Sequence, residues 1–122
     1  MTAATPAALG PVSAPPDGRG QIVFFRPSRL MGMPLGFNVS ENNVDLGRLG
    51  NGRYFVHVAE PGSHAYAVGH SDPLSVDVQP GMTYYVQQNI TGLIGNHAVL
   101  AQADQAAFEA AAPHMRAIAP NQ

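Results

Sequence analysis

Three histidines that lie close together in the sequence, His57, His64 and His70, are the residues best suited to bind a transition metal. If Pro61–Gly62 closes a two-residue hairpin, His57 and His64 project from one face of two paired strands. Zinc and copper accept two or three imidazoles together with an oxygen ligand. The spacing matches no established metal-site motif, and the same histidines could instead bond to backbone groups or lie at a partly solvated edge. A metal-binding or catalytic domain centred on them is therefore an alternative rather than the leading hypothesis.

Other catalytic chemistry has less support in the sequence. The chain has no cysteine, which excludes thiol nucleophiles, thiolate metal sites and disulfides. It lacks the Gly-x-Ser-x-Gly motif of serine hydrolases, and its glycines fall at predicted turns rather than in phosphate-binding loops. Glu41, Glu60 and Glu109 form no convergent pair and are expected to be solvated. We therefore expect no enzymatic activity and no cofactor.

Two segments between predicted strands, Pro27–Leu35 and Thr91–Leu100, are unusually apolar. Loops normally lie on the surface, exposed apolar patches mark interaction sites, and methionine adapts to irregular partners. The alternative is that the two loops fold over an open end of the domain and complete its core. The side chains that we assign to these interaction loops are Leu30, Met31, Met33, Leu93 and Ile94.

The charge balance limits the classes of partner. Only 11% of the residues are charged, and six arginines oppose eight carboxylates for a net charge of −2. Phosphate binding needs clustered lysine or arginine, so we expect no nucleic-acid partner. The apolar loops could contact a membrane surface, but no basic cluster lies beside them to bind anionic lipid. The expected partner is an unknown protein or, in self-association, a second copy of the chain.

The composition changes at about residue 19. Residues 1–19 are rich in alanine and proline and have almost no large apolar side chain, which predicts a flexible tether. Residues 20–122 suffice for a single domain with one core. The tether lacks the basic start and apolar region of a signal peptide, and no stretch of about 18 apolar residues predicts a membrane helix. We expect a periplasmic or outer-envelope protein if an export signal has been removed, and a cytoplasmic one if Met1 is the native start.

From Gly20 to about Leu100 the sequence alternates short β-branched or aromatic runs with turn dipeptides. Turn signals recur every ~8–12 residues, which predicts an all-β, immunoglobulin-like or transthyretin-like antiparallel β-sandwich of seven to eight strands. Gln21–Arg26 is apolar on both faces, which predicts a central strand covered on both sides. Asn42–Asn43 and Asn51–Gly52 each predict a type I′ hairpin.

The turn at Pro80–Gly81 is less regular than these. A two-residue hairpin there would place Thr83 and Gln87 on the apolar face of the preceding strand. Either the turn contains a bulge, or the chain crosses between two sheets. The second possibility matches the start of strand F in immunoglobulin-like sandwiches, where a tyrosine hydroxyl bonds to upstream backbone. We assign this tyrosine-corner role to Tyr84, with an ordinary tyrosine at the edge of the core as the alternative.

The C-terminal segment changes to a helical period. Asp104 is a suitable N-cap, and Pro113 is expected to end or kink the helix. We predict one amphipathic helix over about 104–116 that packs on the sandwich. The apolar positions that define its buried face are Phe108, Ala111, Ala112 and Met115.

Several motifs resemble those of a known protein family. In chain order they are Gly20–Ser28 (GQIVFFRPS), Gly52–Val56 (GRYFV), Glu60–His64 (EPGSH) and Pro80–Val86 (PGMTYYV). They resemble a family of small bacterial exported proteins that is classified only as a domain of unknown function, many of whose members resemble lipoproteins. The resemblance covers about residues 20–112 and implies a β-sandwich in an extracytoplasmic location, without catalytic residues to carry over. The chain departs from that pattern because it lacks a signal segment and a lipobox cysteine.

The leading hypothesis is a non-enzymatic, exported binding or envelope-interaction module of unknown partner. The first alternative is the metal-binding or catalytic domain centred on His57, His64 and His70. The second is a peripheral membrane contact through the apolar loops.

Overall fold

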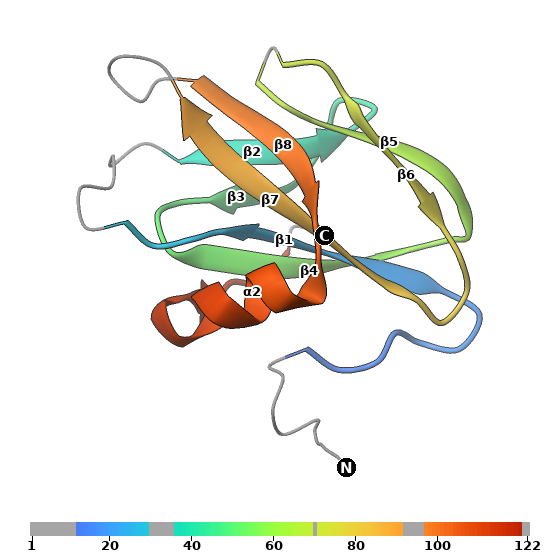
Figure 1. Ribbon diagram of the computed structural model, residues 1–122. Helices are drawn as coiled ribbons and strands as arrows, with labels where there is room; N and C mark the ends of the chain where they lie inside the picture. Colours follow the sequence, from blue (N-terminus) through green and yellow to red (C-terminus); the bar gives the residue numbers. More distant parts are fainter. Residues whose placement is uncertain (1–11, 30–35, 70, 92–96, 121–122) are drawn as a thin grey trace.

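A computed structural model describes residues 12–29, 36–69, 71–91 and 97–120 of the chain. In these residues the chain forms nine strands, one α-helix and one 3₁₀ turn (Figure 1). In chain order they are β1 (Gly20–Arg26), β2 (Phe37–Glu41), β3 (Val44–Leu49), β4 (Arg53–Ala59), β5 (Gly62–Val68), β6 (Leu74–Val78), β7 (Thr83–Thr91), β8 (His97–Ala103), α2 (Gln105–Ala111), the 3₁₀ turn (Ala112–His114) and β9 (Arg116–Ala117).

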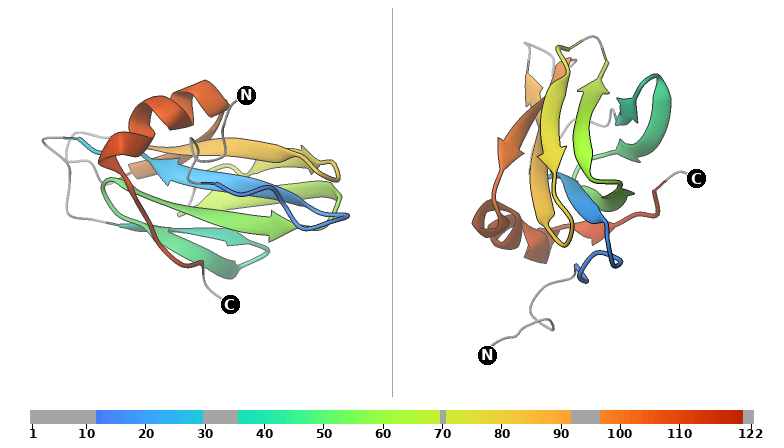
Figure 2. Two further views of the ribbon diagram at one scale, coloured as in Figure 1. Left: turned by 90° about the horizontal axis from the view of Figure 1, so that it is seen from below. Right: turned by 90° about the vertical axis from the view of Figure 1, so that its right-hand side faces the viewer.

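The strands form two sheets that pack as a sandwich. One sheet has the order β8-β7-β1-β4-β9, and the other has the order β3-β2-β5-β6. Helix α2 covers the outer face of the five-stranded sheet, so the molecule has three layers (Figure 2). Most strand pairs are antiparallel, but β1 pairs with β7, and β4 with β9, in parallel. The predicted sandwich with one C-terminal helix is confirmed, with the two-residue β9 as an additional strand.

Strand β1 is central, as its sequence predicts, because all seven of its residues are buried. Ile22 and Phe24 face the four-stranded sheet and belong to the main core. Val23 and Phe25 face the helix and belong to a second apolar cluster. A strand covered on both faces has no solvated side, so both sets of alternating side chains are apolar.

Aromatic rings fill both layers of the interior. Between the sheets, the Phe24 ring centroid lies 5.3 Å from that of Phe55 and 5.1 Å from that of Tyr66. Between sheet and helix, Phe108 makes an edge contact with Tyr54 at 5.1 Å. Edge-to-face and offset contacts at these separations are favourable beyond the area that they bury.

The predicted hairpin at Asn51–Gly52 is wrong, because the chain changes sheets there, and it changes sheets again at Pro61–Gly62, where a hairpin was considered for the histidines. At the first position, the Asn51 side chain bonds to the backbone N–H and C=O of Arg29 at 3.0 and 3.1 Å. These bonds hold the turn against the segment after β1 instead of closing a ladder between β3 and β4. The hairpin at Asn42–Asn43 is confirmed, with φ of 52° and 66° at its two residues.

The chain also changes sheets at Pro80–Gly81, between β6 and β7. The Tyr84 hydroxyl, in a half-buried side chain, accepts a hydrogen bond from the Gln79 backbone N–H at 2.9 Å. Gly20 lies so close that a Cβ atom there would meet the Gln79 carbonyl oxygen at 2.8 Å. The tyrosine corner and the crossing between sheets are therefore both confirmed.

The predicted helix over 104–116 is too long at its C-terminal end. The Asp104 side chain accepts from the Ala107 N–H at 2.8 Å, which confirms the N-cap. The α-helix ends at Ala111, because Pro113 has no N–H to continue the hydrogen-bond pattern. Met115 is buried but follows the 3₁₀ turn, and the next residues form β9. Across the described part of the chain, no helix has the length and apolar character needed to cross a membrane.

Residues 12–19, within the segment that composition assigns to the tether, make several contacts with the domain. Val12 packs against the cluster under the helix, and the Gln21 side chain donates to the Ser13 carbonyl at 2.6 Å. The Gly81 N–H donates to the Arg19 carbonyl at 2.8 Å. The tether boundary at residue 19 stays a prediction.

Candidate functional site

The sandwich presents two different ends. At one end β1 stops at Arg26 and β7 stops at Thr91, and we call this the loop end. At the opposite end β2 stops at Glu41 and β4 stops at Ala59, and we call this the histidine end. The two candidate sites predicted from the sequence belong to these two ends.

The predicted interaction side chains fall outside the described residues. These are Leu30, Met31, Met33, Leu93 and Ile94, and the same holds for His70. The structure does describe the strand ends from which both apolar segments leave. Because β1 and β7 pair in parallel, the two segments depart from the same end of one sheet.

Buried polar side chains hold the strands at the loop end. Arg26 donates from Nη1 to the Leu49 carbonyl at 3.2 Å. The pKa of Arg26 is lowered, mainly by burial and to a smaller extent by the charge of Arg29. The Gln88 Nε2 atom donates to the Phe37 carbonyl at 3.4 Å. Its Oε1 atom is buried and has no hydrogen-bond partner in the described structure. These bonds link the ends of β1 and β7 to the opposite sheet.

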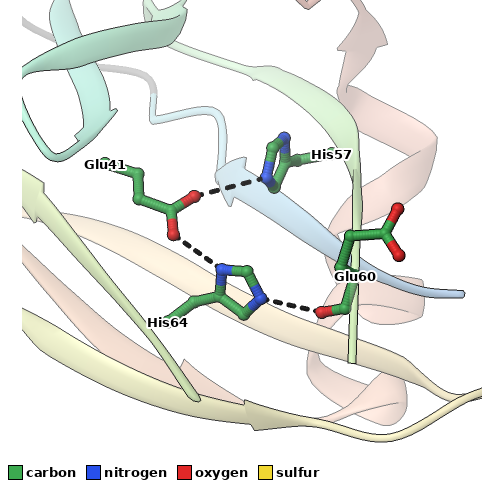
Figure 3. Close-up of polar contacts among 4 residues, drawn as sticks. All are labelled: Glu41, His57, Glu60 and His64. Carbon is green, nitrogen blue, oxygen red and sulfur yellow. Dashed lines mark hydrogen bonds and ion pairs between the residues drawn. The ribbon is translucent and has the colours of Figure 1, made fainter. Parts of the chain in front are cut away.

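At the histidine end, Glu41, His57 and His64 converge, and we call these three residues the histidine cluster (Figure 3). Glu41 Oε2 lies 2.6 Å from His64 Nδ1, and Glu41 Oε1 lies 3.8 Å from His57 Nε2. The second ring nitrogen of His64 lies 2.7 Å from the backbone carbonyl oxygen of Glu60. The side chains of the cluster are only 18–21% exposed.

Strand alternation explains how the cluster forms. Glu41 follows the buried Val39 by two residues in β2, and His57 follows the buried Phe55 by two residues in β4. Both therefore face the space between the sheets. His57 and His64 do come together, as predicted, but across the sandwich rather than along a hairpin. The prediction that Glu41 is solvated is wrong, and its spacing from Val39 is the signal that could have revealed its role.

The contacts of His64 fit a doubly protonated ring that faces an ionised Glu41 carboxylate. A carboxylate and a backbone carbonyl can only accept hydrogen bonds, so both ring nitrogens of His64 must donate. Burial lowers the pKa of His64, but its bonds to Glu41 and Glu60 and the charges of both carboxylates raise it by more. The pKa of His64 therefore lies above its ordinary value, in agreement with an imidazolium ion.

Burial favours the neutral forms of both His57 and Tyr66. Burial lowers the pKa of His57 and outweighs the nearby charge of Glu41. Tyr66 is fully buried, its ring lies 5.9 Å from that of His64, and burial followed by the charge of Glu41 raises its pKa. Its hydroxyl has no hydrogen-bond partner among the described residues. The pKa shifts at the histidine end thus favour the charged form of His64 and the neutral forms of His57 and Tyr66.

This arrangement can exchange protons, but its contacts do not suit metal ligation. Both His64 nitrogens are already bonded to acceptors, and a metal would have to displace one of those bonds. No group of three or more candidate ligands that could hold a metal ion occurs in residues 12–29, 36–69, 71–91 and 97–120. In the same ranges, neither imidazole is hydrogen-bonded to a serine or threonine hydroxyl, as a catalytic triad would need.

A protein-family model matches residues 16–102, which is most of the chain. The description of that family is "protein of unknown function (DUF2846)". This chain belongs to the DUF2846 family. The matched range contains the whole histidine cluster and both apolar segments of this DUF2846 chain, and it stops before helix α2. No curated protein and no solved structure matches the chain.

Proposed function

We propose that this DUF2846 protein is a non-enzymatic, exported binding module that docks a protein of the cell envelope through its two apolar segments. The observation that carries the proposal is the parallel pairing of β1 with β7, with Phe25 opposite Gln87. Parallel neighbours end on the same side of a sheet. The segments that carry Met33 and Leu93 therefore start from one end of the sandwich.

The offset between the two strand ends is small enough for the segments to meet. From the paired residues Phe25 and Gln87, β7 extends four residues further, to Thr91, whereas β1 extends only one, to Arg26. At ~3.3 Å per residue, the segment after β1 must extend roughly 10 Å to draw level with Thr91. Pro27–Ser28 and the residues after them supply that length.

The frame at the loop end suits a binding site. Asn51 bonds to both backbone groups of Arg29, and Gln88 bonds to the backbone of Phe37. Binding loops commonly rest on such a rigid scaffold, where less conformational entropy is lost when a partner binds. The low charge of the chain favours apolar contacts, which depend little on salt. The Ala/Pro-rich N-terminal segment and the resemblance to exported proteins support an envelope location.

The test compares two double variants, each of which replaces two apolar side chains with serine. Met33→Ser with Leu93→Ser removes apolar side chains at the loop end. Val44→Ser with Met82→Ser removes two exposed apolar side chains at the histidine end and is the control. We expect both pairs to change the free energy of unfolding in urea by less than ~1 kcal/mol, as surface substitutions usually do. Only the loop-end pair should abolish capture of an envelope protein from a bacterial envelope extract.

Other outcomes would redirect or end the proposal. If Met33 and Leu93 complete the core, each truncation should cost roughly 2–5 kcal/mol, and the docking role falls. If the loop-end pair instead abolishes binding to vesicles of zwitterionic lipid and leaves protein capture intact, the partner is a membrane surface. Equal capture by the two double variants would also contradict the proposal.

A further inference from the structure

Four strands end the two sheets within the described residues, β8, β9, β3 and β6, and the short β9 leaves residues 55–59 of β4 unpaired on that side. An edge strand presents unpaired backbone N–H and C=O groups that can pair with another strand. Natural proteins usually block such edges with charges, prolines, bulges or short strands. A comparison of the four edges therefore indicates where another chain could add.

Three of these edges carry such features. β3 bears the exposed Asp45 and Arg48, and its register against β2 shifts at Leu46. β6 bears the exposed Asp77 and has a proline close to each end. β9 is two residues long and includes Arg116. Each feature disfavours the addition of a further strand.

The fourth of these strands, β8, has no charged residue, proline or bulge, and it is seven residues long. Its sequence, HAVLAQA, contains no aspartate, glutamate, lysine, arginine or proline across seven residues. Its register against β7 is continuous from Thr91↔His97 to Tyr85↔Ala103. In the right-hand view of Figure 2, no described strand lies beyond it. The Ser71 hydroxyl donates to the Ala98 carbonyl at 2.5 Å, so the start of the strand is partly covered, and the remaining stretch, Val99–Ala103, has no such bond among the described residues.

We propose that Val99–Ala103 of β8 pairs antiparallel with the same segment of a second copy, so that two five-stranded sheets join into one. Backbone groups at a strand edge are matched by another strand, which supplies donors and acceptors at the same spacing. A two-fold axis through the pair makes the contact self-complementary. Because the segment is uncharged, no like charges meet across that axis. This proposal does not depend on the apolar segments at the loop end.

The test uses two valines of nearly equal exposure on different edges. Val99 is 37% exposed on β8, and Val58 is 39% exposed on the half of β4 that β9 leaves unpaired. Val99→Lys places an ammonium group of each copy opposite Ala103 of the other copy, where pairing would take water from the charge. Val58→Lys adds the same charge elsewhere and is the matched control.

Sedimentation equilibrium over a range of concentrations measures the outcome. We expect the wild-type chain to dimerise, Val99→Lys to raise the dimer dissociation constant at least about tenfold, and Val58→Lys to leave it within about twofold. Amide hydrogen exchange of the wild-type chain supplies a readout that does not depend on the folding of any variant. Protection of the amides in Val99–Ala103 that point away from β7 should rise with protein concentration, because pairing gives them acceptors.

Three results would overturn the proposal. One is a wild-type chain that stays monomeric at the highest concentration. The second is a wild-type dimer that dissociates on Val58→Lys but not on Val99→Lys. That result would place the contact on β4 rather than on β8. The third is exchange at Val99–Ala103 that does not change with concentration.

Discussion

His64 couples its own protonation to the stability of the sandwich. Its folded-state pKa is raised above 6.5, so the stability it contributes is complete below about pH 6.5 and is lost as the pH rises through that higher value. The folded-state pKa of His57 is lowered, so its contribution is present above about pH 6.5 and is lost as the pH falls through the lower value. Together the two histidines favour a stability maximum between these two pKa values.

The first prediction tests separately the loss of stability on the acidic side and on the alkaline side of that maximum. Urea unfolding from pH 5 to pH 9 should show that His64→Gln removes stability mainly at acidic and neutral pH and flattens the alkaline limb. His57→Gln should flatten the acid limb instead. Subtracting each variant from the wild type cancels the titration of groups that do not interact with the replaced histidine. Parallel curves for all three proteins would contradict the assignment of an imidazolium at His64.

The second prediction contrasts two tyrosines whose hydroxyls have opposite environments. Tyr84→Phe removes the acceptor of the Gln79 N–H and should cost about 0.5–1.5 kcal/mol. Tyr66→Phe removes a buried hydroxyl without a partner among the described residues, so it should be neutral or stabilising. Chemical denaturation of the two variants gives both values. A larger loss for Tyr66→Phe than for Tyr84→Phe would show that the Tyr66 hydroxyl does have a partner.

At the scale of elements, the third prediction concerns the helical layer. Phe108 is the buried residue of α2, and its ring contacts those of Phe25 and Tyr54. Phe108→Ala should therefore lower the free energy of unfolding by about 3–5 kcal/mol. Glu109→Ala changes the adjacent exposed residue and should cost less than about 0.5 kcal/mol. Equal small losses would mean that the helix adds little to the sandwich.

Local features of the sequence predicted most of the strands but not every connection. The apolar residues on both faces of Gln21–Arg26 identified the central strand, and Asn42–Asn43 identified the hairpin between β2 and β3. Both signals act between neighbouring residues. Asn51–Gly52 failed as a hairpin because a dipeptide determines local φ values, not the sheet that the next strand joins. That choice depends on distant contacts, here with Arg29. Tyr84 succeeded because its corner joins residues only five apart.

The histidine end was predicted in part and for an incorrect reason. The proximity of His57 and His64 followed from an assumed hairpin, whereas in the structure each belongs to a different sheet. Glu41 was missed because its position beside the Asn42–Asn43 turn is typical of a solvated carboxylate. Which strands face one another across a sandwich is a long-range property, and the sequence has no local signal for it.

At the scale of the whole molecule, the domain has a different candidate site at each of its two ends. At the histidine end, the bonds of His64 tie the two sheets together. The loop end combines buried polar anchors, such as Arg26, with the two segments assigned to docking. Each end can therefore be altered without changing the other, and this independence makes the loop-end and control variants comparable.

The central claim is that the apolar segments present their methionines to solvent and to a partner. Native-state oxidation with dilute peroxide, followed by peptide mass spectrometry, tests it within one chain. Met82 is 52% exposed and Met115 is 9% exposed, so they calibrate the fast and slow limits. We predict that Met31 and Met33 are oxidised at the rate of Met82. Rates as slow as that of Met115 would show that these side chains complete the core, and would contradict the docking function.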